Sequence, residues 1–380
     1  MQQRTIGRLW EAANGRPAGF DYLRISLAAM VILMHAPLVS YGRESAASMA
    51  RGLPFLHPIY YFVLPSFFAL SGFLVAGSLL RNDLVSFAAL RVIRIFPALM
   101  AEVIICALTI GPIFTIFALR QYFTDSRFFA YFFNMLGYIH FRLPGVFTTL
   151  PYPDIVNEQL WTVPIELECY ISLIFLALVG LHRRIGFFLL FTILLTLGLL
   201  IYNTVNNSWP APDQPATARI LVLNFLFGVF FFILKDRFVM NKWLALASLA
   251  CFIALCTSTI GVYLTPFFSA YTTIGLGLTN RRFAPLIGLS NYSYGVYLYG
   301  FPVQQVVASI FPQYRIWWFN FAVSVVAAAV LGAISWHSLE VKFGDRKKFL
   351  LASLHRLLSA GGAASGPVVS KLGALVSRRA

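Results

Sequence analysis

Long apolar segments recur along almost the whole chain, and this feature constrains the fold more than any other. A transmembrane helix needs about 20 consecutive apolar residues, whereas an outer-membrane β-strand needs about 10 residues of alternating polarity. The segments here have the helical length and do not alternate. We therefore predict an all-α, polytopic membrane bundle of about ten helices, at residues 20–40, 59–80, 92–117, 160–181, 185–203, 219–234, 243–260, 262–278, 286–311 and 316–340.

The positive charges are unevenly divided between the predicted loops. Of the 29 Lys and Arg residues, 21 lie in segments on the same side as the N-terminus, and seven lie on the opposite side. Cytoplasmic segments of membrane proteins carry such an excess. The bias predicts that both termini are cytoplasmic. It also explains the net charge of +15 without nucleic acid as a partner.

The chain divides into two regions of different composition. Residues 1–341 form the predicted transmembrane domain, and residues 342–380 are basic and then rich in Ala, Gly and Ser, which predicts a largely disordered cytoplasmic tail. The longest outside loop, residues 118–159, is predicted to be a lid that faces the acceptor. The four cysteines lie in apolar runs without metal-ligand spacing, so we expect small apolar residues and no metal site.

The first predicted span carries an arginine and a histidine on one helical face. Arg24 and His35 are 11 residues apart, which places them about 20° apart around a helix and about 16 Å apart along it. An ionisable group inside a span is costly and marks a candidate functional site. The alternative is structural: Arg24 reaches the interface beside Asp21, and His35 is a core histidine with satisfied hydrogen bonds.

A carboxylate in the fourth predicted span lies at a similar depth. Glu166 is about 9 Å below the outer end of its span, and His35 is about 8 Å below the outer end of the first span. A buried glutamate needs a partner or a proton, so we predict that His35 and Glu166 pair. The alternative for Glu166 is a structural hydrogen bond. Glu168 faces another side and is predicted to be structural.

Two arginines open the third predicted span, and a small-residue segment lies within the second. Arg91 and Arg94 form a positive cluster at the inner interface, where they either anchor a phosphorylated ligand or simply obey the topological charge rule. In the second span, Ser71 and Gly72 follow a proline. Gly72 permits either close helix packing or access of a ligand to the backbone.

Taken together, these segments resemble the acyltransferase-3 family of membrane O-acyltransferases. FDYLR at 20–24, followed by His35, resembles the family's opening arginine and histidine element. FFALSGFL at 67–74 resembles its FxLSGFL segment, and RVIRIFP at 91–97 resembles its RxxRIxP element. LWTVPIE at 160–166, followed by Tyr170, resembles its LWxLxxE element.

A fifth segment resembles the family with a departure. SNYSYGVYLYGFP at 290–302 is similar to the SYxxYLWHxP element, but Tyr299 and Gly300 stand where many members have Trp and His. No role can be transferred to that second histidine.

The resemblance implies an enzyme that moves an acyl group, most simply acetyl, from cytoplasmic acyl-coenzyme A to a hydroxyl of a surface or exported glycan or a lipid-linked sugar. Histidine suits the removal of a hydroxyl proton near neutral pH, so His35 is the expected catalytic base or acyl carrier, and Glu166 would steady its charge. The resemblance implies one set of residues for the cofactor and another for the acceptor: Arg24, Arg91, Arg94, Ser71 and Gly72 for the former, and Trp161, Tyr297 and Tyr299 for the latter.

Two other classes remain open from the residues alone. A polytopic transporter or flippase would use His35, Glu166 and Glu102 as a proton relay. A lipid-linked glycan polymerase or ligase would act without coenzyme A. The resemblance favours the acyltransferase, in the inner membrane of a bacterium and in contact with the lipid bilayer. The oligomeric state is left open.

Overall fold

The computed structural model describes residues 4–180, 184–209, 215–279, 288–345 and 351. Within these ranges the chain is helical, and its only bridges between extended segments are two isolated ones, at Thr5–Val239 and Thr115–Val146. The all-α prediction is confirmed for this part of the chain. The principal helices are α1 (Ile6–Ala12), α2 (Ala18–Tyr41), α3 (Arg43–Gly52), α4 (His57–Arg81), α5 (Leu84–Ile105), α9 (Thr162–Leu178), α10 (Ile185–Val205), α11 (Ala218–Ile233), α12 (Lys242–Leu255), α13 (Thr265–Gly277), α14 (Ser293–Ile310), α15 (Trp317–Ser335) and α16 (Val341–Asp345).

Six helical runs in the described residues are long and apolar enough to cross a bilayer. They are Ala18–Tyr41, Pro54–Arg81, Leu84–Phe114, Glu158–Leu178, Gly186–Val205 and Trp317–Gly344. The other four predicted spans also fall on helices, but α11, α12 and α13 have only 16, 14 and 13 residues. The 18-residue α14 carries two glutamines and three tyrosines. Six crossings are therefore supported, and the count of about ten stays a prediction.

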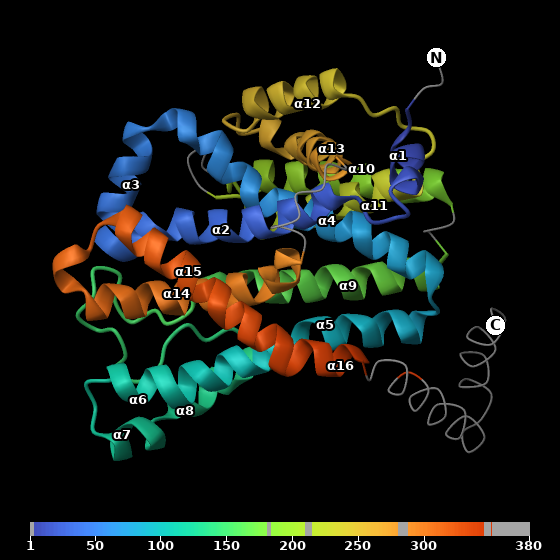
Figure 1. Ribbon diagram of the computed structural model, residues 1–380. Coiled ribbons are helices and arrows are strands. Elements are labelled where there is room, and N and C mark those ends of the chain that lie inside the picture. Colours follow the sequence, from blue (N-terminus) through green and yellow to red (C-terminus); the bar gives the residue numbers. More distant parts are fainter. Residues whose placement is uncertain (1–3, 181–183, 210–214, 280–287, 346–350, 352–380) are drawn as a thin grey trace.

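The long helices lie side by side and share one general direction (Figure 1). The helices α3 and α7 (Leu119–Thr124) lie toward the left of this view, and α1 and α16 lie toward the right, α1 in the upper part and α16 in the lower part. Placing α1 and α16 at one end requires an even number of crossings between them. The orientation, with both termini in the cytoplasm, stays a prediction.

Helix α4 forms the centre of the bundle and packs against α2, α11 and α13. Two glycines bring its backbone close to that of α11. A Cβ at Gly72 would lie 2.0 Å from the carbonyl oxygen of Phe225, and a Cβ at Gly228 would lie 2.1 Å from that of Ala69. Small residues permit such contact between membrane helices. Gly72 is thus required by the packing of α4 on α11.

Local signals explain where the helices near the site begin and bend. Asp83 caps α5, since its carboxylate accepts hydrogen bonds from the backbone N–H groups of Val85 and Ser86. Proline lies inside α2, α4, α5 and α14, where each ring removes one helical hydrogen bond. Two π-helical turns, Cys106–Ile110 and Trp336–Glu340, extend α5 and α15. Such turns frequently occur at functional sites.

Several predictions fall on parts of the chain outside the described residues. These are the inside-loop arginines Arg183, Arg281 and Arg282, the start of the predicted span at 286–311, and nearly all of the tail at 342–380. Of that tail, the structure describes residues 342–345, within α16, and Leu351.

Candidate active site

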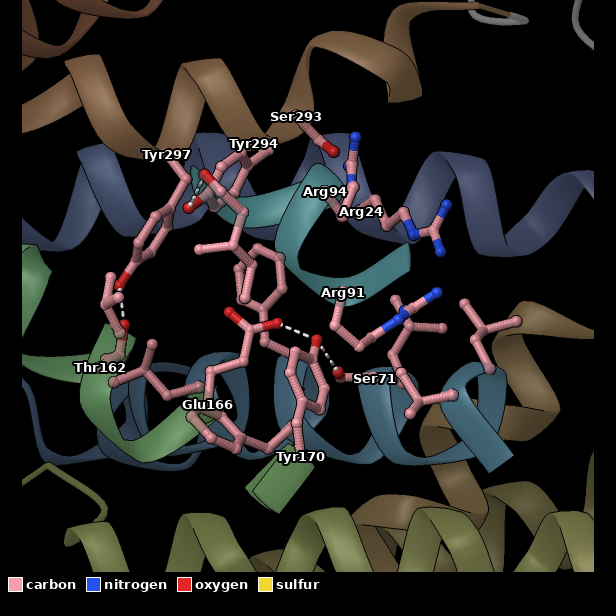
Figure 2. Close-up of a pocket in the computed structure, with 18 residues that line it drawn as sticks. Arg24, Ser71, Arg91, Arg94, Thr162, Glu166, Tyr170, Ser293, Tyr294 and Tyr297 are labelled. Carbon is pink, nitrogen blue, oxygen red and sulfur yellow. Dashed lines mark hydrogen bonds between the residues drawn. The ribbon is translucent and has the colours of Figure 1, made fainter. Parts of the chain in front are cut away.

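A cavity of about 160 Å³ lies between α2, α4, α5, α9 and α14. Figure 2 shows that arginines gather at one side of it, while a carboxylate and several hydroxyl groups lie around the remainder. Its polar lining consists of Arg24, Ser71, Arg91, Arg94, Thr162, Glu166, Tyr170, Ser293, Tyr294 and Tyr297. All five segments that resemble the family thus contribute polar side chains to one cavity.

The three arginines of the cavity differ in how they are held. Arg94 donates to Glu340 at 3.0 Å, and the Glu340 side chain is only 4% exposed. Arg91 lies over the rings of Phe87 and Tyr170, at 5.7 and 5.9 Å from their centroids, and its Nε has no partner among the described residues. Hence Arg91 keeps hydrogen-bond donors for a ligand, whereas Arg94 is partly engaged.

Arg24 also keeps its donors. No hydrogen bond or ion pair of Arg24 is found within the described residues, and Asp21, one turn before it, does not approach within salt-bridge distance. The structural alternative in which Arg24 pairs with Asp21 is therefore not what this structure shows. Because α2 is continuous from Ala18 to Tyr41, Arg24 and His35 do lie on one helix.

The carboxylate of the cavity belongs to a short hydrogen-bonded series. The Tyr170 hydroxyl donates to Glu166 Oε1, and the Tyr170 oxygen lies 3.2 Å from Ser71 Oγ (Figure 2). Tyr170 follows Glu166 by four residues, so the two side chains share one face of α9. This series links α9 to α4 and directs the carboxylate into the cavity.

His35 lies outside this cavity, against α14. Its Nδ1 is 2.8 Å from the carbonyl oxygen of Val31, and its ring meets the ring of Phe301 edge to face at 5.3 Å. A carbonyl oxygen only accepts, so Nδ1 carries the hydrogen. In the neutral ring Nε2 then holds the lone pair and is the basic atom.

The predicted pairing of His35 with Glu166 is not seen. Among the described residues, Glu166 is hydrogen-bonded to Tyr170, and no hydrogen bond or ion pair joins it to His35. Tyr297 lines the cavity, and Phe301, which touches His35, lies four residues further along α14, or about 6 Å. His35 therefore lies about one helical turn beyond the wall of the cavity.

That wall contains a hydrogen-bond cluster that the sequence did not reveal. The Tyr297 hydroxyl lies 2.6 Å from Thr162 Oγ1 and donates to the carbonyl of Gln159 at 2.9 Å. The side chain of Gln159 in turn donates to the carbonyl of Leu298 at 2.8 Å. Pro302 has no N–H for that carbonyl, which leaves it available to Gln159. The sequence signal for this cluster was Pro302 inside an apolar run, together with Gln159 two residues before Trp161.

Comparison with known proteins agrees with this arrangement. The family model described as Acyltransferase domain, of the acyltransferase-3 family, matches residues 18–337. The chain belongs to this family. It is also similar to a protein named O-acetyl transferase from Shigella phage Sf6, with 27% identity over 354 residues, which cover 86% of this chain and 96% of that protein. No solved structure matches. The protein is therefore an acyltransferase-3 enzyme, an O-acetyltransferase embedded in a membrane.

The residues expected to contact the acceptor occupy different surroundings in this acyltransferase-3 chain. Tyr297 lines the cavity, as described above. Trp161 ends a 3₁₀ turn, Glu158–Trp161, and packs half-buried against the core without lining the cavity. Tyr299 is buried, packs with Val303 and Val307 against α15, and also lies outside the cavity. Only Tyr297 of the three is in position to touch a molecule there.

Two glycines of the family segments permit close contact between helices. Gly72 faces the backbone of α11 and does not line the cavity, so the expectation that it contacts a cofactor is not supported. Gly300 stands where many family members have histidine. A Cβ there would lie 2.7 Å from Ile32 Cγ1, so in this chain the position is filled by the close approach of α14 to α2.

The groups proposed for a proton relay are separated. Glu102 is fully buried, where it accepts hydrogen bonds from Cys106 at 2.9 Å and from Asn157. The bond from Asn157 attaches the outside loop to α5. No hydrogen-bonded chain in the described residues connects Glu102 with Glu166 or His35, which disfavours the transporter alternative. No group of three His, Cys, Asp or Glu side chains suited to a metal ion occurs in the described ranges.

The predicted outside loop is anchored near His35. Tyr152 stacks against Phe301 at 6.2 Å, donates to Glu158 at 2.8 Å and accepts from Arg43 at 2.6 Å. Burial, followed by the hydrogen bond to Glu158, raises the pKa of Tyr152 to about 12. The phenol therefore stays protonated at neutral pH and can donate to Glu158. This anchoring holds Tyr152 against Phe301, which also contacts His35, and the assignment of the loop as a lid stays a prediction.

Proposed function

We propose that the enzyme transfers an acetyl group from cytoplasmic acetyl-coenzyme A to a hydroxyl of a surface glycan or lipid-linked sugar on the outer side of the bacterial inner membrane. The observation that carries this proposal is the arrangement on α2. Arg24, with donors free, lies in the arginine-lined cavity, and His35, with Nε2 free to act as a base, lies about 16 Å further along the same helix. The name of the phage relative supports acetyl as the group.

The arginines suit the phosphates of the donor. Guanidinium groups bind phosphate through charge-assisted hydrogen bonds, and Arg24 and Arg91 hold unused donors in the cavity. The same residues lie toward the α16 end of the bundle, which the charge bias assigns to the cytoplasm. Acetyl-coenzyme A, when bound, supplies a thioester carbonyl at the end of a long arm. That arm has a reach comparable with the separation of Arg24 and His35.

The chemistry falls to His35. Its Nε2 takes the proton of the acceptor hydroxyl as the oxygen attacks the thioester carbon. The C–S bond breaks, and the imidazolium returns the proton to the departing thiolate. The hydrogen bond from Nδ1 to Val31 holds the ring in one tautomer throughout. Glu166 does not touch the imidazole, so we assign it to the donor cavity, where with Tyr170 and Ser71 it shapes the wall opposite the arginines.

Radiolabelled acetyl-coenzyme A supplied to inverted membrane vesicles tests the proposal. We expect label on glycan in vesicles containing the wild-type enzyme and none with His35→Ala. Glu168→Gln is the matched control, because Glu168 is on α9 and does not line the cavity. Label that appears equally with His35→Ala would contradict the mechanism. A wild-type enzyme that moves a solute and leaves glycan unlabelled would favour a transporter.

A further inference from the structure

A second cavity, of about 510 Å³, lies beyond His35 at the α3 end of the bundle. It is enclosed by the end of α2, by α3, by the start of α4, and by the segments at Pro215 and Thr257. One face of α3 lines it through Ala46, Ala47, Met49 and Ala50, whereas Ser45 and Ser48 point elsewhere. Cavities of this size that are mainly apolar with a few polar groups are the usual form of a small-molecule site.

Two polar side chains of this outer cavity, those of His57 and Arg51, lack partners among the described residues. Both ring nitrogens of His57 are buried and have no hydrogen-bond partner among the described residues. A buried polar atom without a partner is costly, and its retention points to a ligand. Arg51 also lines the cavity and makes no ion pair within the described ranges. Arg43 lines it too, but is held by Tyr152 and lies 3.7 Å from Glu158.

The outer cavity approaches the turn of α2 that carries His35, although His35 itself lines neither cavity. Met34 and Pro37, which flank His35 in α2, are part of its lining. A series of contacts also connects its rim with the imidazole: Arg43 bonds to Tyr152, and Phe301 meets the rings of both Tyr152 and His35 edge to face. Along α2, Arg24 thus lines the arginine-lined cavity, and the turn that carries His35 lines the outer cavity through Met34 and Pro37.

We propose that the outer cavity binds the acceptor as a saccharide that carries an anionic group, a phosphate or a carboxylate. Arg51 and His57 would hold the anion, because both offer N–H donors and the Arg51 guanidinium carries a full positive charge. Tyr60 and the apolar face of α3 would contact the sugar ring. The acceptor hydroxyl would then meet Nε2 of His35. The inference rests on the proposed acetyl transfer and adds to it the place and charge of the acceptor.

Blocking the cavity with a covalent label tests this assignment. In a background carrying Cys251→Ser, which removes the exposed thiol, Ala47→Cys is labelled from outside with a bulky, membrane-impermeant maleimide. Ser48→Cys is the matched control on the same helix, since Ser48 is exposed and does not line the cavity. We expect labelled Ala47→Cys to lose at least about tenfold of its transfer to glycan while its affinity for acetyl-coenzyme A is unchanged. Equal transfer by the two labelled variants would overturn the assignment.

A protection assay tests the same cavity without relying on activity. Glucose, glucose 1-phosphate and glucuronate are added while the labelling rate of Ala47→Cys is measured. An anionic sugar should slow labelling at a concentration about 10- to 100-fold lower than glucose, and Arg51→Gln should remove that difference. The better of the two anions identifies phosphate or carboxylate. If the three sugars protect equally, the anionic assignment is wrong, and if none protects, the cavity is not the acceptor site.

The two assays separate this inference from the proposed function. If the unlabelled parent enzyme showed no transfer, the proposed function would be contradicted. The protection assay would then still show whether the outer cavity binds an anionic sugar. Transfer that survives in labelled Ala47→Cys would contradict only the acceptor site.

Discussion

The side chain of Gln159 donates a 2.8 Å hydrogen bond to the carbonyl of Leu298, which Pro302 leaves without a helical partner. The bond joins the start of α9 to the bend in α14 and thereby positions Tyr297, whose hydroxyl donates to the Gln159 carbonyl. Gln159 thus holds the wall between the donor cavity and His35, together with the bonds of Asn157 to Leu298 and of Thr162 to Tyr297. The Leu298 carbonyl of α14 accepts from the Gln159 side chain, and the Gln159 carbonyl accepts from the Tyr297 hydroxyl of α14, so each segment satisfies a backbone group of the other.

This relationship predicts a double-mutant result. Gln159→Leu should lower the free energy of unfolding by about 1–3 kcal/mol, because the buried Leu298 carbonyl keeps only its longer bond from Asn157, at 3.3 Å, and the Tyr297 carbonyl loses the Gln159 amide. In Pro302→Ala the N–H of residue 302 can bond to Leu298, so adding Gln159→Leu should then cost less. Thermal unfolding of the four proteins in detergent measures the coupling. Equal losses in both backgrounds would show that the glutamine does not serve the freed carbonyl.

Removal of the imidazole should affect chemistry more than donor binding. His35→Ala should slow transfer by about a hundredfold to ten-thousandfold, as expected for loss of a general base, while leaving the affinity for acetyl-coenzyme A unchanged. Equilibrium binding and single-turnover transfer provide the two numbers. An equal loss in donor affinity and in transfer rate would assign His35 to donor binding.

Glu166 should act with Tyr170 and independently of His35. Tyr170→Phe removes the hydrogen bond to Glu166, and Glu166→Gln removes the charge of its acceptor, so their effects on transfer should not add. Glu166→Gln and His35→Gln share no contact, so their separate effects on rate should multiply. Transfer rates of the two double mutants, compared with those of the single mutants, measure whether the effects add. Non-additivity between His35 and Glu166 would restore the pairing that the sequence suggested.

Arg91 should contribute to donor affinity more than to folding. Arg91→Gln should weaken acetyl-coenzyme A binding by about 10- to 100-fold, since a hydrogen bond to a charged group contributes about 1.5–3 kcal/mol. Arg91→Lys should restore part of the affinity, because the charge remains and the forked geometry is lost. Isothermal titration in detergent measures the constants. An unchanged affinity in Arg91→Gln would assign the residue to topology alone.

Arg94 combines a structural and a binding role through Glu340. Arg94→Gln should destabilise the fold, because it leaves the buried Glu340 carboxylate without its cation. The double variant Arg94→Gln with Glu340→Gln should recover stability and still bind acetyl-coenzyme A weakly. Unfolding temperature and donor affinity are compared across the set. If the double variant recovered both properties, Arg94 would have no role in binding the donor.

The sequence by itself determined the class of the protein and the contents of its helices. Runs of about 20 apolar residues can satisfy their backbone in a bilayer only as helices, so composition alone predicted an all-α membrane bundle. Spacing within one helix is equally local, and α2 carries Arg24 and His35 on one unbroken helix, as the arithmetic required. Motif order sufficed to indicate the family, which the family model then showed.

Only the tertiary structure decided which of these groups meet. Depth along a helix follows from residue number, but the rotation and lateral position of a helix depend on packing against its neighbours. His35 and Glu166 were therefore matched in depth yet lie on different sides of the Tyr297 wall. For the same reason Arg94 meets Glu340 from a segment 246 residues away, and Gln159 meets the carbonyl that Pro302 frees. These contacts join distant segments whose positions no local pattern encodes.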